Sequence, residues 1–145
     1  MRGLMRIAGI VTLLGISALA GAAQGAEEQR VTIAMGENDG RMYYRPDRVT
    51  LRVGVSAVIS LVNQGRTTHE WMVYDIPTAP GKPEHMWTEK RTYFKNVKAT
   101  VKGAAKVDRS RAGDLLELEL KPKREATVEF TPSRKGRFEM GCLLP

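Results

Sequence analysis

LELELKPKREATVEFTPSRKGRFEMGC, residues 116–142, contains three short segments in which apolar and polar residues alternate. The segments are LELEL, ATVEF and RFEM, and the stretches between them, KPKR and TPSRKG, are rich in turn-forming and charged residues. An alternation of period two is typical of strands that bury one face. In the last segment Cys142 has the parity of Phe138 and Met140, so its sulfur is expected to point inward. This part of the chain predicts antiparallel β-structure.

The first half of the chain carries similar signals. Each expected strand has an apolar or alternating pattern and a turn signal at its end; the expected strands are residues 31–35, 49–53, 57–62 and 70–74. The turns are expected at 36–40 (GENDG) and 63–65 (NQG). Many short strands separated by turns favour an all-β sandwich or barrel.

The N-terminus is a segment of a different kind. Residues 1–26 combine Arg2 and Arg6 with a following apolar run and several small residues. This layout is typical of a signal peptide and predicts a periplasmic or secreted protein. Without the two arginines of this segment, which has no acidic residue, the formal net charge falls from +7 to +5. The remaining residues, 27–145, are enough for one domain.

Residues 75–112 are predicted to form an irregular basic insertion. Three prolines interrupt its first part, and its second part is basic and weakly patterned, with one short strand expected around Thr100 and Val101. Its positive charge would suit docking to an acidic redox partner, and any membrane contact would be peripheral. We expect a monomer, and no nucleic-acid-binding motif accompanies the charge.

Cys142 is the only cysteine of the chain, and His69 is one of two histidines. A single cysteine in an exported protein is a buried inert thiol, an intermolecular disulfide partner or a metal ligand. Imidazole and thiolate together form a soft donor set that suits copper or zinc rather than magnesium or calcium. The residues alone leave these alternatives open.

The segment GRFEMGCLLP, residues 136–145, resembles the copper-binding end of the cupredoxin family, which includes plastocyanins and azurins. Asn63, Gln64 and Gly65, followed by His69, are similar to the family's segment that leads to its first copper-binding histidine. The resemblance implies a cupredoxin-like antiparallel Greek-key β-sandwich. It also implies that His69 and Cys142 bind copper and that the protein transfers single electrons through a type 1 copper site.

The chain departs from the family pattern after Pro145, where the family continues into a second histidine and an axial methionine. The resemblance therefore implies a C-terminally truncated sequence whose last strand is missing. His85 and Met86 are the candidate substitutes for the missing ligands, although a loop pair without a metal role is the simpler interpretation. Glu70 could orient His69, but exposure on its strand is the simpler expectation.

Two other functions remain open. The first is a copper carrier or assembly module, and the second is a metal-free β-sandwich that acts as a binding module. We do not expect an enzyme, because the chain has no nucleophile elbow, no helical zinc-binding histidine pair and no convincing pair of catalytic carboxylates.

Overall fold

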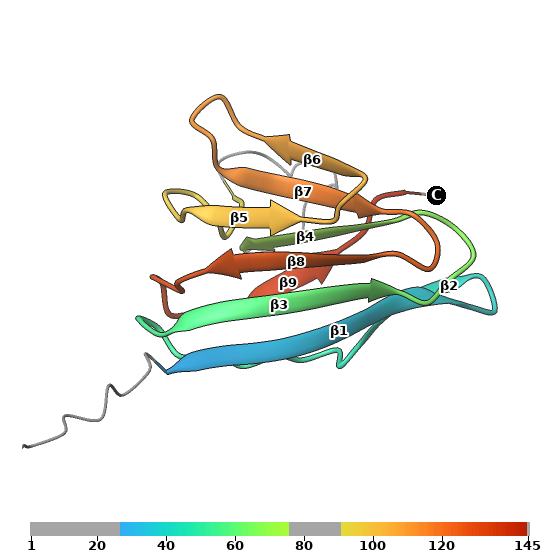
Figure 1. Cartoon of the computed structure of the whole chain (residues 1–145), viewed down its shortest axis with the longest axis horizontal. Helices are drawn as coiled ribbons and strands as arrows, with labels where there is room; N and C mark the ends of the chain where they lie inside the picture. The colour runs from blue at the N-terminus through green and yellow to red at the C-terminus, as the bar shows by residue number, and fades with distance from the viewer. Residues whose placement is uncertain (1–26, 76–90, 145) are drawn as a thin grey trace, which may run out of the picture.

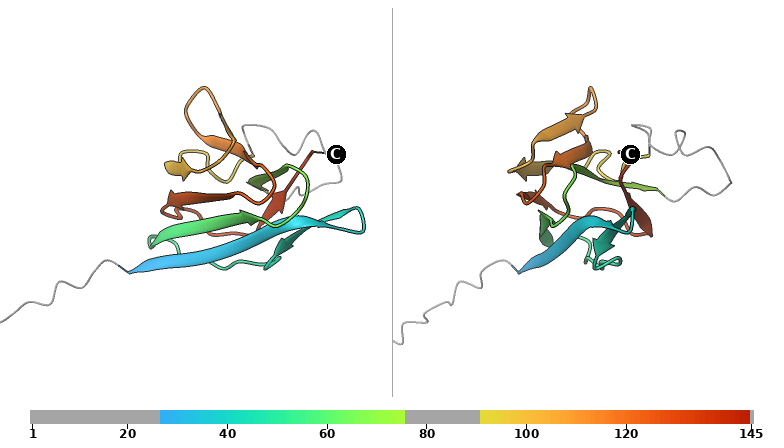
Figure 2. Two further views of the ribbon diagram at one scale, coloured as in Figure 1. Left: turned by 45° about the vertical axis from the view of Figure 1, so that its right-hand side comes forward. Right: turned by 90° about the vertical axis from the view of Figure 1, so that its right-hand side faces the viewer.

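The computed structural model describes residues 27–75 and 91–144, and this part of the chain is a sandwich of two β-sheets without a helix. Figure 1 shows β1, β3, β8 and β5 lying side by side, and Figure 2 shows the same arrangement turned by 45° and by 90°. The all-β sandwich expected from the sequence is confirmed. The two sheets enclose one hydrophobic core.

The larger sheet has the strand order β2-β1-β3-β8-β5. Its strands are β1 (Glu28–Asn38), β2 (Arg41–Arg45), β3 (Ser56–Asn63), β5 (Ala99–Lys102) and β8 (Glu125–Phe130). The smaller sheet has the order β6-β7-β4-β9. Its strands are β4 (His69–Asp75), β6 (Lys106–Arg109), β7 (Leu115–Leu120) and β9 (Phe138–Gly141). The chain passes from the larger sheet to the smaller one after β3, after β5 and after β8.

The pairing is not antiparallel throughout. β1 and β3 are parallel over eight residue pairs, from Glu28 opposite Ser56 to Met35 opposite Asn63, while every other strand pair in the described residues is antiparallel. The larger sheet is therefore mixed. The sequence could not reveal this, because alternation fixes the buried face of a strand but not the direction of its neighbour.

The first strand is longer than expected, and a second strand follows it. β1 continues to Asn38, and the turn is reduced to Asp39 and Gly40, whose φ angles are 49° and 72°. A two-residue Asp-Gly turn with positive φ at both positions matches the twist of a β-hairpin. The predicted turn at 36–40 was therefore wrong at Gly36 and Glu37, which pair with β2.

Residues 49–53 do not form the expected strand. Val49 and Leu51 pack half-buried against the core, as their alternation predicts, but their backbone pairs with no strand. A strand needs a partner as well as a pattern, and this segment pairs with no described strand; the backbone of Arg52 bonds instead to the side chain of Gln29 on β1. The prediction was right about the buried face at Val49 and Leu51, and wrong about Val53, which is 41% exposed, and about the secondary structure.

The second half of the expected basic insertion contributes much of the core. Tyr93 and Phe94 are 6% and 1% exposed, and their rings meet edge to face with a centroid separation of 5.3 Å. Two strands follow, β5 and β6, where one was expected. Hence residues 91–111 are not irregular. The many lysines and arginines of this stretch suggested an irregular insertion, and composition alone does not show that it also contributes core residues.

β7 contains an irregularity that changes which leucines are buried. Its register with β6 shifts next to Arg109, which pairs with Leu115. As a result Leu115 is 1% exposed, whereas Leu116 is only half-buried. A bulge reverses the parity of the residues on one side of it, so the regular alternation of LELEL predicted the wrong residue at this end of the strand.

Three predictions concern residues outside the described ranges: the signal peptide at 1–26, the proline-rich start of the insertion, and the pair His85 and Met86. Within the described residues, no helix is long and apolar enough to cross a membrane.

Candidate functional site

The turn after β3 is built around a fully buried amide. Asn63 is 0% exposed; its Nδ2 donates to the carbonyl oxygens of Thr67 and Leu120, both at 2.9 Å, and its Oδ1 accepts the N–H of Gly65 at 2.9 Å. All these bonds are short-range except the one to β7, which ties the turn to the smaller sheet. The amide thereby fixes where the chain enters β4 at His69.

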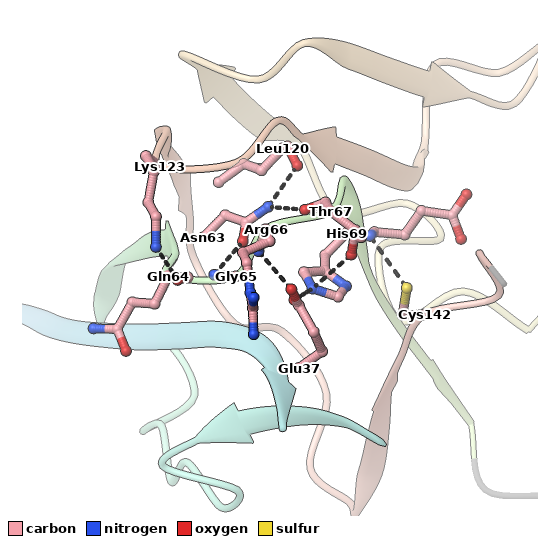
Figure 3. A network of polar contacts seen from close by, with 11 residues as sticks. Glu37, Asn63, Gln64, Gly65, Arg66, Thr67, His69, Leu120, Lys123 and Cys142 are labelled. Atoms are coloured by element: carbon pink, nitrogen blue, oxygen red, sulfur yellow. Dashed lines mark hydrogen bonds and ion pairs between the residues drawn. The ribbon is translucent and has the colours of Figure 1, made fainter. Parts of the chain in front are cut away.

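His69 is the first residue of β4 and is 5% exposed. Its Nε2 lies 2.7 Å from Oε2 of Glu37, near the end of β1 (Figure 3). The other carboxylate oxygen of Glu37 accepts the N–H of Arg66 at 2.5 Å. The hydrogen bond from His69, followed by that from the Arg66 amide, holds the pKa of Glu37 below its ordinary value of 4.5. Glu37 is therefore ionised at neutral pH.

Gly65 makes room for this pair. A Cβ at position 65 would lie 2.9 Å from Nε2 of His69 and would overlap the carboxylate of Glu37. Any side chain here would displace the Glu37 carboxylate or the imidazole. The NQG turn thus has a role beyond reversing the chain, because its glycine lets the carboxylate approach the ring.

Cys142 follows β9, which runs antiparallel to β4 with Met72 opposite Gly141. Its Sγ accepts the backbone N–H of Glu70 at 3.3 Å, and the carboxylate of Glu70 accepts the N–H of Leu143 at 2.9 Å. Figure 3 shows the thiol and the imidazole of His69 at the same end of β4. Glu70 therefore holds the segment that carries Cys142 through two hydrogen bonds, one from its backbone N–H and one to its carboxylate.

Tyr44, a residue of β2, contacts both β4 and β9 at this end of the sandwich. Its hydroxyl lies 2.7 Å from the carbonyl oxygens of both Glu70 and Gly141, so it can donate to one strand or the other. Burial, followed by the nearby Cys142 and Glu70, raises the pKa of Tyr44 above its ordinary value. The hydroxyl stays protonated and links the two strands that bear His69 and Cys142.

Three carboxylates, those of Glu70, Glu117 and Glu119, offer oxygens within 4.8 Å of one another. The Nζ of Lys106 lies 3.1 Å from Glu119 and 3.6 Å from Glu117. The ammonium group of this lysine therefore already offsets part of the negative charge of the cluster. Burial, with contributions from Asp108 and Glu70, raises the pKa of Glu117 to about 7. Glu70, which was expected on the surface, is 6% exposed, and the partner of its carboxylate is the N–H of Leu143 rather than Lys106.

The structure brings the two predicted metal ligands to one end of the paired strands β4 and β9. Among the residues that the structure describes, no methionine side chain takes part in the hydrogen-bonded network around them: Met35 is 0% exposed in the core, and Met140 packs against that core. The residue that sequence reasoning missed is Glu37. Its signal was present, because Ile33, Met35 and Glu37 share one parity and an inward-facing carboxylate at a strand end needs a polar partner.

No protein-family model matches the chain, and no curated protein matches it. Among solved structures, the chain is similar to a multicopper oxidase from Campylobacter jejuni, described as a metallo-oxidase. The match has 13% sequence identity and a TM-score of 0.45, and covers 92% of this chain and 30% of that chain. The chain thus spans less than a third of that oxidase. A similarity of this size establishes neither a common family nor a common activity, and the class stated for the chain, a two-sheet all-β sandwich, rests on its strand pairing.

Proposed function

We propose that the protein is an exported, cupredoxin-like copper-binding protein in which Nδ1 of His69 and Sγ of Cys142 bind the metal. The observation that carries this proposal is the hydrogen bond between His69 Nε2 and Glu37. An ionised carboxylate only accepts hydrogen bonds, so the proton of a neutral imidazole lies on Nε2. The lone pair is then on Nδ1, which accepts no hydrogen bond from the described residues.

This arrangement is the one that metal-binding histidines need. A ligating imidazole usually donates its other N–H to a carboxylate or a carbonyl, which fixes its tautomer and orientation and raises its basicity. Here Glu37 has that position, and Gly65 provides the space for it. Glu37 is thus a positioning residue, whose effect on the metal would pass through His69.

The environment of Cys142 fits a thiolate ligand. The N–H of Glu70 points to its sulfur, and a hydrogen bond to a sulfur stabilises negative charge on it. Such bonds also tune the redox potential of copper–thiolate sites. One imidazole nitrogen and one thiolate form a soft donor set that suits copper.

Bound copper would supply one-electron chemistry, and the residues of this chain would hold the metal and control access to it. Electron transfer is our first proposal, because both donors lie on strands that are locked together by Tyr44, Glu70 and the β4–β9 pairing. A rigid site changes little when copper changes its oxidation state. A redox partner with an acidic surface would suit the basic chain.

The test is a Cu(II) titration of the full chain, with the visible spectrum and the urea midpoint recorded at each point. We expect an intense thiolate-to-copper absorption band and a copper-dependent rise in stability. Cys142→Ser should abolish the band. Glu37→Gln should weaken copper binding by about 10- to 100-fold, as other changes behind a ligating histidine do, and Glu37→Asp should recover part of the loss.

His85→Gln is the matched control, because it removes the other histidine of the chain and should leave the band unchanged. The absence of both a band and a stability increase would overturn copper binding and favour the metal-free binding module. A bound copper that cannot be reduced and reoxidised reversibly would support a copper carrier instead of electron transfer.

A further inference from the structure

A groove opens on the side of the sandwich, away from the network around His69. Its volume is about 550 Å³, and residues of both sheets line it. We call it the lateral groove and define its walls as residues 47–53 and 132–140. Its floor includes Ile33 and Ile59 from the larger sheet and Trp71 from the smaller one. The lateral groove therefore borders the hydrophobic core, whose residues at its floor are 1–3% exposed.

Each wall of the lateral groove includes a stretch of backbone with no partner strand on one side among the described residues. Other parts of the walls are held, because the backbone of Arg52 bonds to the side chain of Gln29 and Gly54 donates to Pro132. Among the described strands, β9 pairs only with β4 and is the edge of the smaller sheet. On the opposite wall, residues 47–51 form no hydrogen bond with any described residue. Unpaired backbone groups beside an apolar surface are a template for another strand, and natural proteins usually cover or blunt such edges.

Side chains beside the lateral groove are also incompletely buried. Phe138 and Met140 face the core from β9 but are only half-buried, whereas Leu118 and Leu120 on β7 are 0% exposed. An occupant that brings apolar side chains would bury Phe138 and Met140 further.

The rim of the lateral groove carries more basic than acidic side chains, and its acidic ones are Asp47 and Glu139. Arg48, Lys135 and Arg137 are exposed, and none of them pairs with an acidic group of the described residues. Arg134, in contrast, is held by Asp75 at 3.3 Å and by the carbonyl oxygen of Tyr93 at 2.9 Å. Charge complementarity therefore favours an acidic occupant. It disfavours a second copy of this chain, whose own rim carries the same positive charge.

We propose that the lateral groove accepts an extended strand from a partner protein, which adds to the free edge of β9. In such strand addition, backbone hydrogen bonds supply affinity and pockets for alternate side chains supply specificity. The strand that fits has apolar residues on the face toward Ile59 and Trp71, and acidic residues on the face toward the rim. A small apolar molecule would fill the volume but would leave both backbone walls unpaired.

The test uses the metal-free full chain and a short peptide of alternating valine and glutamate, with an alternating valine and lysine peptide as the matched probe. We expect saturable binding of the acidic peptide, slower amide hydrogen exchange in residues 138–141, and much weaker binding of the basic peptide. The double variant Lys135→Glu, Arg137→Glu should weaken binding of the acidic peptide by about tenfold or more. Lys121→Glu, an exposed change on the β7–β8 turn, should have no effect.

Several outcomes would overturn the proposal. One is failure of the acidic peptide to bind, and another is binding that ignores the reversal of charge at the rim. Protection of the outward-facing β9 amides, those that do not bond to β4, before any peptide is added, in a monomer, would show that another segment of the same chain covers the edge. The same protection in a dimer would assign the groove to a second copy. Because copper is absent throughout, these results are independent of the test of His69 and Cys142.

Discussion

Two regions of the sandwich differ in how their polar groups are satisfied: the end that holds His69, and the lateral groove. Around His69, buried polar groups find partners inside the chain: the amide of Asn63 bonds to three backbone groups, and the hydroxyl of Tyr44 reaches two strands. Along the lateral groove, the backbone of residues 47–51 and the outer edge of β9 lack partners among the described residues.

This difference separates two kinds of site. A network that is complete within the chain is rigid, and rigidity suits a metal ligand whose position must not change. An apolar surface bordered by unpaired backbone gains stability when another polypeptide covers it. We therefore associate the His69 end with metal chemistry and the lateral groove with protein association.

The largest expected effect tests whether side chains are packed more tightly in the core than in the wall of the lateral groove. Leu118→Ala removes a side chain that is 0% exposed between the sheets, and should lower the free energy of unfolding by about 4 kcal/mol. Leu51→Ala makes the same change in the half-buried wall of the lateral groove and should cost about 1 kcal/mol. Urea denaturation measures both. Equal losses would contradict the comparison, because they would mean that the groove wall is packed as tightly as the core.

A somewhat smaller effect is expected at Asn63. Asn63→Ala leaves the N–H of Gly65 and two carbonyl oxygens without their buried partner, and should cost about 3 kcal/mol of unfolding free energy. Asn63→Asp keeps the acceptor for Gly65 but places a buried carboxylate oxygen against the carbonyl oxygens of Thr67 and Leu120, so it should cost at least as much. Gln64→Ala, at an exposed neighbour, is the control for a change in the same turn. A loss at Asn63 no larger than that at Gln64 would show that the network does not stabilise this end.

The smallest effect is a pH dependence at Glu37. The pKa of Glu37 is lowered in the folded protein, so the contribution of its carboxylate to stability is fully present above about pH 4.5 and is lost as the pH falls through the folded-state pKa. Glu37→Gln should therefore make the acid side of the stability curve shallower. Urea midpoints measured across this pH range test it, with Glu125→Gln as an exposed control on β8. An unchanged acid side would mean that the hydrogen bond between Glu37 and His69 does not form in solution.

Alternation in the sequence was sufficient to predict most strands and their buried faces. β3, β4, β8 and β9 lie close to where the pattern placed them, because a period of two identifies the face that loses contact with water. The pattern failed where a neighbour decides the structure. Residues 49–53 alternate as a strand does but have no strand beside them, and the bulge in β7 exchanged the burial of Leu115 and Leu116.

The residues of the candidate site also fall into two groups: those that the sequence identified, and those that only the fold brings together. His69 and Cys142 were identified from residue type and from the resemblance of the segments that contain them. Glu37, which lies 32 positions before His69, could not be paired with it from the sequence, because the contact depends on the parallel pairing of β1 with β3. The unexpected burial of Glu70 likewise depends on β7 and on the segment after β9.

The sequence by itself therefore determined the fold class and most of the buried faces, since these follow from local periodicity. It supplied His69 and Cys142 only as candidate donors, from the chemistry of their side chains and from a family resemblance. The tertiary structure alone decided the direction of β1 and β3, the carboxylate behind His69 and the exposed edge of β9. Each of these depends on which strands are neighbours, and neighbours are chosen by packing between residues far apart in the chain, which no local pattern encodes.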